Sequence, residues 1–278
     1  MKKIGFIDLY LSEWHANNYP AWFKDAVAAT GPDFELAYAW GEMDKSPVDG
    51  VTSAEWCAKF NVILCDTLEE VCEKSDAIVI LAPSHPEVHL NYAEKVFPFG
   101  KPTYVDKPFA PDFETAKEIF ALAKLYNTPF FSSSALRYAE ELMPCRNVAV
   151  TGGGSSPEEY LIHQAEMVVK CLGCGAGSVC CREVDGSLIF DLKYDDGRCG
   201  RMTYQAKLPF TAAMGDSESV SSVPVKSPYF KNLISDMLRF FEEKTVSFDL
   251  CQTLEVAAIC EAAFSAKKTR KKDIEVIR

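Results

Sequence analysis

The chain has no glycine at the position where a nucleotide-binding α/β protein most needs one. Its first apolar run, residues 3–8, leads into the loop Asp8-Leu-Tyr-Leu-Ser-Glu-Trp14, which contains none. In a Gly-x-Gly-x-x-Gly loop, glycines let the backbone approach a pyrophosphate at a helix N-terminus. Here the carboxylates of Asp8 and Glu13 would face that pyrophosphate. This absence argues against the usual pose of a dinucleotide.

An excess of basic charge and long apolar runs are also missing. The formal net charge is −11 and the pI is about 5.0, which argues against nucleic acid as a partner. The one dense basic run, residues 267–272, is typical of a helix end, where cations offset the helix dipole. No segment reaches the roughly 18 apolar residues that a membrane helix needs. We therefore predict neither a nucleic-acid nor a membrane partner.

A signal-peptide pattern is absent as well, because Met1-Lys-Lys-Ile-Gly-Phe runs directly into the first predicted strand. The cysteines number eleven, and an odd count without a secretory signal predicts free thiols in a reducing compartment. We therefore predict a cytoplasmic location. The densest thiol cluster comprises Cys171, Cys174, Cys180 and Cys181. Neighbouring cysteines on a strand point to opposite faces and make a poor zinc site, so we expect no metal there.

The first half of the chain alternates between strand and helix patterns, as expected of a doubly wound parallel sheet. The uninterrupted apolar run at 76–82 is typical of a parallel strand covered on both faces. The other predicted strands lie near 3–8, 34–40, 61–65, 102–105 and 128–134. Helices are predicted near 20–29, 53–60, 67–75, 87–97 and 112–126, with Ser53 and Thr67 as N-caps.

The second half has a different pattern. Gly152-Gly-Gly-Ser-Ser-Pro157 predicts a flexible break before a helix at 158–171. Alternating runs at 178–184, 187–194 and 198–207 are joined by Asp185-Gly186 and Asp195-Asp-Gly197, which predict hairpins. Two helices, near 229–244 and 253–268, close the chain. We predict an α/β fold: a Rossmann-like doubly wound domain at 1–135, then an α+β domain with an open, mainly antiparallel sheet at 136–278.

Lys107 is the residue around which the candidate site is organised. It follows the short strand at 102–105, and Pro108 prevents the ladder from continuing, so the lysine should lie at the carboxyl edge of the sheet, where ligands bind. The alternative is a plain strand exit with a surface ion pair between Lys107 and Asp106. Arg137 and Tyr138 follow the last predicted strand and would face the same cleft, unless Arg137 forms a structural ion pair.

Two pairs of residues that contain histidine are also candidates. Glu159 and His163 are spaced i, i+4 and would share one helix face, as candidates for proton transfer or as an ordinary side-chain pair. His85 and His89 have the spacing of a metal pair, but no Glu or Cys pattern completes a site. A loop and helix-cap role is the simpler interpretation for them.

Three motifs resemble the Gfo/Idh/MocA family, which includes glucose-fructose oxidoreductase and inositol dehydrogenase. Ala82-Pro-Ser followed by His89 resembles the Thr-Pro-Asn…His stretch of that family. The block GKPTYVDKPFA at 100–110 resembles its Gly-Lys-His-Val-x-x-Glu-Lys-Pro-Leu-Ala block, with Asp106 in place of Glu. Residues 159–163, running on to Leu172-Gly173, resemble its Asp-x-x-x-His helix that ends in Leu-Gly, with Glu159 in place of Asp. The glycine loop is the main departure.

The resemblance implies NAD or NADP as cofactor and a hydroxylated small molecule, such as a sugar, inositol or polyol, as substrate. It also implies a homo-oligomer that assembles through the C-terminal sheet. Lys107, His163 and Glu159 would be catalytic, and Lys107, Arg137, Tyr138 and His163 would bind substrate. The cofactor would contact Asp8, Tyr10, Leu11, Glu42, Ala82, Pro83, Ser84, His89, Asp106 and Lys107, with Glu42 as the substitute for the acid that grips the adenosine ribose.

The chemistry is consistent with these roles. Removing a hydride from a carbinol requires a group that takes the hydroxyl proton and a cation that holds the developing alkoxide. Lys107 would supply the cation, His163 would accept the proton, and Glu159 would orient the ring. Two alternatives remain open: a ligand-binding or regulatory protein that has lost hydride transfer, and a non-redox lyase that uses Lys107 and His163 as acid and base.

Overall fold

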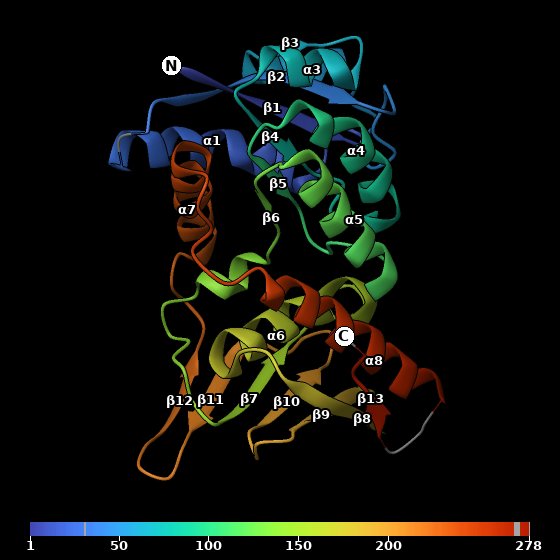
Figure 1. Cartoon of the computed structure of the whole chain (residues 1–278), viewed down its shortest axis with the longest axis vertical. Coiled ribbons are helices and arrows are strands. Elements are labelled where there is room, and N and C mark those ends of the chain that lie inside the picture. Colours follow the sequence, from blue (N-terminus) through green and yellow to red (C-terminus); the bar gives the residue numbers. More distant parts are fainter. Residues whose placement is uncertain (31, 270–272, 278) are drawn as a thin grey trace. The chain divides into compact units, whose positions relative to one another are not determined.

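The computed structural model describes residues 1–30, 32–269 and 273–277 (Figure 1). Contacts divide the chain into two compact units. The first comprises Met1–Ser132 and Lys231–Phe248, and the second Ser133–Phe230 and Asp249–Arg278. The functional division that we predicted, into a nucleotide-binding half and a substrate and oligomerisation half, stays a prediction.

The first unit contains the predicted Rossmann-like sheet. Its six strands follow the order β3-β2-β1-β4-β5-β6, and the pairs are parallel. All four residues of β4 are buried, as expected of a strand covered on both faces. The predicted fold class is therefore confirmed for this half. The strands are β1 (Lys2–Asp8), β2 (Phe34–Gly41), β3 (Ile63–Leu64), β4 (Ala77–Ile80), β5 (Thr103–Val105) and β6 (Phe130–Phe131).

Helices connect these strands, and side-chain caps fix where most of them begin. The Thr67 hydroxyl caps α3 as predicted, and Asp112 caps α5. The predicted cap of α2 at Ser53 is wrong by one residue, because Thr52 and Glu55 form a capping box there. The helices are α1 (Trp14–Thr30), α2 (Ser53–Phe60), α3 (Leu68–Lys74), α4 (His89–Val96) and α5 (Phe113–Tyr126), with 3-10 turns η1 (Pro86–Val88) and η2 (Phe97–Phe99).

Helix α1 begins six residues before the predicted start at Pro20, which lies inside it. The reason is a cap formed by Glu13, whose carboxylate accepts hydrogen bonds from the backbone N–H groups of His15 and Ala16. Residues 14–19, which precede the predicted helix at 20–29, are therefore helical as well.

Helix α7 (Tyr229–Glu243) packs largely on the first unit, although it follows most of the second unit in sequence. The rings of Phe241 and Phe34 are 5.9 Å apart, and those of Phe240 and Phe131 are 4.9 Å apart. These contacts close the core of the parallel sheet with a helix from distant sequence.

The second unit contains a seven-stranded sheet of order β12-β11-β7-β10-β9-β8-β13, in which β7 and β10 are parallel and the other pairs antiparallel. Helices α6 (Pro157–Leu172) and α8 (Cys251–Thr269) lie on one face (Figure 1). This confirms the predicted open, mainly antiparallel sheet. Its strands are β7 (Asn147–Gly152), β8 (Ala176–Val184), β9 (Ser187–Tyr194), β10 (Cys199–Tyr204), β11 (Thr211–Gly215), β12 (Val220–Pro224) and β13 (Ile274–Glu275).

Glycines act here through turn geometry and close packing. Asp185 and Gly186, with φ of 50° and 73°, make the tight β8–β9 turn and confirm the predicted hairpin. The predicted break at 152–157 separates β7 from α6. Gly152 ends β7, and a side chain on Gly153 would collide with the backbone carbonyl of Gln205.

Among the described residues, no helix is long and apolar enough to cross a membrane.

Candidate functional site

The carboxyl ends of three neighbouring strands bring most of the predicted first-unit residues together. In the sheet register Ile7 pairs with Ile80, which pairs with Val105. The ladder continues as Leu81 N–H donates to Ile7 and Asp106 N–H donates to Ile80, at 2.8 and 2.9 Å. The segments that carry Asp8, Ala82 and Lys107 therefore leave the sheet side by side. This is the edge where open α/β sheets bind ligands.

Asp8 ties two of these strand ends together. Its buried Oδ1 accepts hydrogen bonds from Leu9 N–H at 2.7 Å and from Ala82 N–H at 3.0 Å. Burial and the nearby Glu13 carboxylate raise the pKa of Asp8 well above its ordinary value. Ala82 has a φ of 61°, a left-handed conformation that is uncommon outside glycine and concentrates at functional sites.

The N-terminus of α1 is already occupied by the protein's own carboxylate. Glu13 is buried, and His15 N–H donates to its Oε2 at 2.7 Å while Ala16 N–H donates to Oε1. These are the N–H groups that a dinucleotide diphosphate would use at a helix start. Because they already bind an anion, the diphosphate does not fit at this helix end.

The segment after β2 is hydrogen-bonded to the loop between β1 and α1. Met43 N–H donates to the Leu9 carbonyl at 2.8 Å, and the Ser46 hydroxyl donates to the Ser12 carbonyl at 2.9 Å. Leu11, a predicted cofactor contact, is 1% exposed and therefore packs in the core. Tyr10 is half-buried, and its ring meets that of His85 edge-on at 6.2 Å.

Asp106 and Lys107 have separate environments. The Asp106 carboxylate is buried, accepts a hydrogen bond from the Tyr104 hydroxyl at 2.9 Å, and lies 3.8 Å from His15 Nε2. Lys107 is half-buried, and no acid among the described residues lies within 4.0 Å of its amine. The surface ion pair between Asp106 and Lys107 that we considered does not form, so the lysine cation is available to a ligand.

His89 contacts the loop that carries Lys107. The side chain is fully buried, with Nε2 2.7 Å from the Leu81 carbonyl and Nδ1 3.0 Å from the Phe109 carbonyl. Burial lowers the pKa of His89, although both carbonyls favour its charged form. Because both ring nitrogens lie against backbone carbonyls, His89 connects the end of β4 to the Lys107 loop. It therefore positions this loop and does not contact a ligand directly.

Glu42 is the residue that could bind the adenosine ribose of a dinucleotide. Glu42 is exposed directly after β2, and its carboxylate accepts a hydrogen bond from the Tyr92 hydroxyl at 2.6 Å. An acid at the end of the second strand is the group that grips an adenosine ribose. Pro83 is half-buried and Ser84 exposed at the same carboxyl edge. The chain therefore fits the adenosine and edge contacts of NAD or NADP, but the diphosphate must lie away from the first turn of α1.

His163 lies on α6 in the second unit. It is 8% exposed, its Nδ1 is 2.6 Å from the Ser134 hydroxyl, and its ring packs edge-on against Tyr160 and Phe210. Ser134 Oγ also accepts a hydrogen bond from Leu136 N–H at 3.1 Å. The imidazole therefore lies against a serine, whereas the Glu159 carboxylate accepts a hydrogen bond from the Ser155 hydroxyl at 2.5 Å.

Arg137 forms the structural ion pair that we considered as the alternative to substrate binding. It is 3% exposed; its Nε donates to Glu166 at 2.6 Å and its Nη1 to Gln252 at 2.5 Å. Burial raises the pKa of Glu166, and the guanidinium opposes that shift. This geometry favours a role for Arg137 in holding η3 (Ala135–Tyr138) against α6 and α8. Tyr138, the other predicted substrate contact, is half-buried at the end of η3.

Sequence reasoning missed the side chains that hold the candidate residues in place. Ser134 ends a run of three serines after the last strand of the parallel sheet, which was the available signal. Glu166 lies three residues after His163 on α6, again a visible spacing. No comparable pattern distinguishes Glu13 as the cap of α1.

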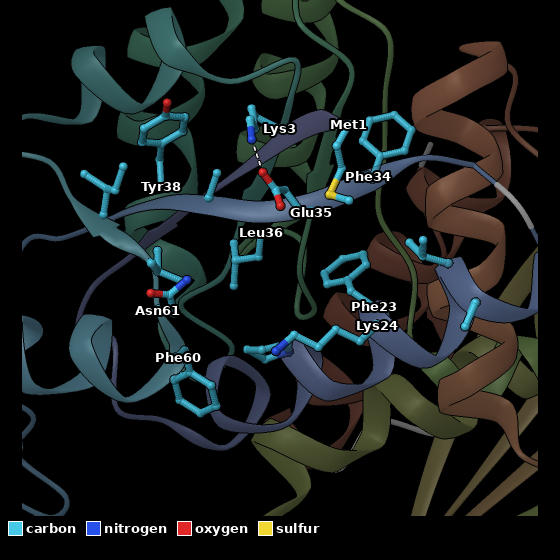
Figure 2. Close-up of a pocket in the computed structure, with 16 residues that line it drawn as sticks. Met1, Lys3, Phe23, Lys24, Phe34, Glu35, Leu36, Tyr38, Phe60 and Asn61 are labelled. Atoms are coloured by element: carbon cyan, nitrogen blue, oxygen red, sulfur yellow. Dashed lines mark hydrogen bonds and ion pairs between the residues drawn. The ribbon is translucent and has the colours of Figure 1, made fainter.

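A cavity of about 650 Å³ lies elsewhere in the first unit (Figure 2). Phe23 and Lys24 of α1, Phe34 and Leu36 of β2, and Phe60 at the end of α2 contribute to its lining. Its wall includes the paired residues near the starts of β1 and β2, whereas the candidate site lies at the carboxyl ends. None of the predicted site residues belongs to its described lining, and we assign it no part in the reaction.

Comparison with known proteins finds a family match within the first unit. Residues 27–132 match the Gfo/Idh/MocA model, described as an oxidoreductase family with an NAD-binding Rossmann fold. The uncharacterized oxidoreductase YhhX of Escherichia coli is 40% identical over 57 residues, which are 20% of this chain and 16% of YhhX. The predicted resemblance to Gfo/Idh/MocA oxidoreductases is thereby confirmed for the Rossmann half, and the NAD-binding description of the family model supports NAD or NADP as cofactor.

Solved structures agree over nearly the whole chain. UDP-N-acetylglucosamine 3-dehydrogenase GnnA from Acidithiobacillus ferrooxidans superposes with a TM-score of 0.77 at 14% identity, covering 95% of this chain and 97% of that one. GenD2 from gentamicin A biosynthesis, in complex with NAD, gives a TM-score of 0.74 at 13% identity and covers 100% and 97%. At these identities the likeness concerns the fold, and it includes both units.

Proposed function

We propose, from the match to the Gfo/Idh/MocA oxidoreductases, that this protein uses NAD or NADP to oxidise or reduce a sugar-, inositol- or polyol-like secondary alcohol. The observation that carries the proposal is Lys107. It leaves the Rossmann sheet beside Ala82 at the carboxyl edge, on a loop that His89 fixes, without an acid partner among the described residues. A cation held in this way is suited to an alkoxide.

In this proposal the dinucleotide supplies the hydride chemistry when bound, and the chain supplies charge and proton transfer. The Lys107 amine holds the substrate oxygen and stabilises the negative charge that develops there. His163 is the proton acceptor in the second unit, and Nε2 is the accepting atom because Nδ1 lies against the Ser134 hydroxyl. Glu159 lies one turn earlier on α6 and helps to retain that proton through its negative charge.

A substrate screen tests this assignment. Purified protein is incubated with NAD or NADP and a panel of inositols, polyols and sugars, and nicotinamide absorbance is followed. Lys107→Ala should lower turnover by about 100-fold or more while leaving cofactor affinity nearly unchanged, because the lost charge acts mainly on the developing alkoxide. Lys101→Ala is the matched control, since Lys101 lies at the other end of β5 and should keep normal turnover. Normal turnover in Lys107→Ala would remove Lys107 from the mechanism.

A second candidate function is a ligand-binding or regulatory protein that no longer transfers hydride. It is favoured by one observation, the Glu13 carboxylate at the α1 N-terminus. This candidate predicts that neither NADH nor NADPH binds and that no alcohol in the panel is turned over. Saturable cofactor binding with measurable turnover would exclude it.

We also propose a homo-oligomer that assembles through the sheet face not covered by α6 and α8, in the cytoplasm. The location is supported by the eleven cysteines, all of which are free thiols. Light scattering after gel filtration tests the assembly. Ile189→Lys, on the uncovered face of β9, should shift the mass towards the monomer, whereas a monomeric wild-type protein would contradict the proposal.

A further inference from the structure

Two thiols of the second unit lie in contact although 77 positions separate them. The Sγ atoms of Cys174 and Cys251 are 3.0 Å apart. Cys174 lies in the turn between α6 and β8, and Cys251 is the first residue of α8. The structure thus separates the cluster singled out in the sequence: Cys171 is buried with its sulfur 3.8 Å from that of Met214, whereas Cys174 faces a different helix.

Hydrogen bonds hold both backbones that carry these thiols. Glu255, one turn after Cys251 on α8, is buried and accepts hydrogen bonds from the N–H groups of Gly175 and Ala176 at 2.8 and 2.7 Å. Arg198 donates to the Cys174 carbonyl at 3.1 Å. On the other side, Cys251 N–H donates to Asp249 at 2.9 Å. The turn and the helix start are therefore fixed against each other independently of the sulfur atoms.

The pair is also accessible to small reagents. Cys251 is exposed and Cys174 half-buried. Disulfide formation requires sulfur atoms that approach closely on backbones able to hold them, together with access for the oxidant. Both conditions are met here.

We propose that Cys174 and Cys251 form a redox-modification site, a dithiol that a hydroperoxide oxidises to an intrachain disulfide. The Cys251 thiolate attacks one peroxide oxygen, an S–O bond forms, and the O–O bond breaks to release hydroxide. The Cys174 sulfur then attacks the sulfenic sulfur, an S–S bond forms, and the S–O bond breaks to release a second hydroxide. The two thiols lose two electrons and two protons, and hydrogen peroxide becomes two waters.

The rate should be modest, because burial raises the pKa of the Cys174 thiol to about 12 and also raises that of Cys251. Oxidation would fasten the first turn of α8, where Gln252 holds the guanidinium of Arg137. The expected consequence is a more rigid second unit in the oxidised protein.

The test is a mass-spectrometric map of the full chain after a timed exposure to excess hydrogen peroxide, alkylation of the remaining thiols and tryptic digestion. We expect a cross-link between peptides 171–182 and 245–267, with fragment ions that assign it to Cys174 and Cys251 and with loss on reduction. Cys174→Ser and Cys251→Ser should each abolish this link. Cys171→Ser, in the same peptide as Cys174, should retain it.

Thermal melting provides an independent measurement. Because the link closes a loop of 77 positions, the oxidised wild-type protein should melt about 5 °C or more above its reduced form. Cys251→Ser should melt at the same temperature before and after peroxide treatment. Full alkylation of both cysteines after treatment, a link that requires Cys171, or unchanged melting of the cross-linked protein would overturn the proposal.

Discussion

The Glu13 carboxylate binds the two N–H groups at the start of α1 that a diphosphate would otherwise contact. Replacing it with an isosteric amide removes a negative charge while keeping an oxygen that can accept one of these bonds. Because this charge repels a bound diphosphate, Glu13→Gln should tighten NADH or NADPH binding by about tenfold. The measurement is a nicotinamide fluorescence titration.

Glu55 provides a matched control for Glu13. It also lies in the first turn of a helix, α2, but it is exposed and its carboxylate accepts hydrogen bonds from the Thr52 N–H and hydroxyl rather than from the start of α1. Glu55→Gln should leave cofactor affinity unchanged. Equal affinities of the wild type and Glu13→Gln would show that the Glu13 charge does not weaken dinucleotide binding.

Asp8 offers a second test at the scale of one residue, through pH. The pKa of Asp8 is raised in the folded protein. Its contribution to folding stability is therefore fully present below the ordinary pKa of 3.8, and it is lost as pH rises through the pKa of the folded protein. Asn at this position keeps the oxygen that accepts from Leu9 and Ala82 but carries no charge. Asp8→Asn should therefore raise the free energy of unfolding at pH 7, with a smaller gain near pH 4.

Urea unfolding across this pH range provides the measurement for Asp8. Asp49 is a suitable control because its pKa is lowered, chiefly by the Ser12 hydroxyl, which gives the opposite sign. Asp49→Asn should not stabilise the protein at pH 7. A gain for Asp8→Asn that grows as pH falls would contradict the assigned direction.

At the scale of elements, His89 joins the end of β4 to the loop that carries Lys107. A neutral His89 ring donates to one of the two buried carbonyls, and His89→Gln disturbs that bond and the packing around it, which should cost about 1–3 kcal/mol of stability. It should also lower turnover, because the lysine loop loses its support. Chemical unfolding and steady-state kinetics are the measurements, with the half-buried His85 as the control position.

The lowered pKa of His89 adds a pH signature. The neutral ring is favoured in the folded state, so its contribution is present above the ordinary pKa of 6.5 and is lost as pH falls towards the folded value. The wild type should therefore lose stability on acidification below about pH 6.5, and His89→Gln should lose less. Parallel pH profiles of the two proteins would contradict this assignment.

The Arg137–Glu166 pair makes an equivalent test in the second unit. Arg137→Met leaves a buried carboxylate unpaired and should cost about 3–5 kcal/mol. Arg239→Met removes a more exposed ion pair with Asp236 and should cost about 1 kcal/mol or less. Similar losses for both variants in urea unfolding would argue against a buried structural role for Arg137.

Particular elements show what the sequence could predict. The strand at 76–82 and the Asp185-Gly186 hairpin were visible because apolar runs and tight turns depend on neighbouring residues. The pairing of β7 with β10, and the return of α7 to the parallel sheet, depend on contacts between distant segments and left no local pattern. The start of α1 was missed because Glu13, an unusual capping residue, extends the helix past the expected boundary at Pro20.

The candidate site also contains residues that a local sequence pattern indicates and residues whose partners only the fold reveals. Lys107 and His163 are candidates that the sequence could indicate, because the first follows a strand end and the second has a helical spacing from Glu159. Ser134 and Glu166, which hold His163 and Arg137, become apparent only once η3 and α6 are placed together. Positioning residues act across the fold, so local spacing alone could not assign their partners.

At the scale of the whole molecule, the carboxyl edge of the Rossmann sheet carries Lys107, which has no acid partner among the described residues. At the same edge the Glu13 carboxylate binds the N–H groups at the start of α1. The account predicts that the protein nevertheless binds the dinucleotide, through contacts other than the α1 start. Of the four tryptophans, Trp40 lies two residues before Glu42, the expected adenosine contact, so a bound dinucleotide should quench its emission.

The most direct measurement is a titration of the wild-type protein with NADH and NADPH, followed by tryptophan fluorescence. The account predicts saturable quenching by at least one of them at or below about 1 mM, the upper end of common KM values. No saturable response to either dinucleotide at that concentration would contradict the assignment of this chain as an NAD(P)-dependent oxidoreductase.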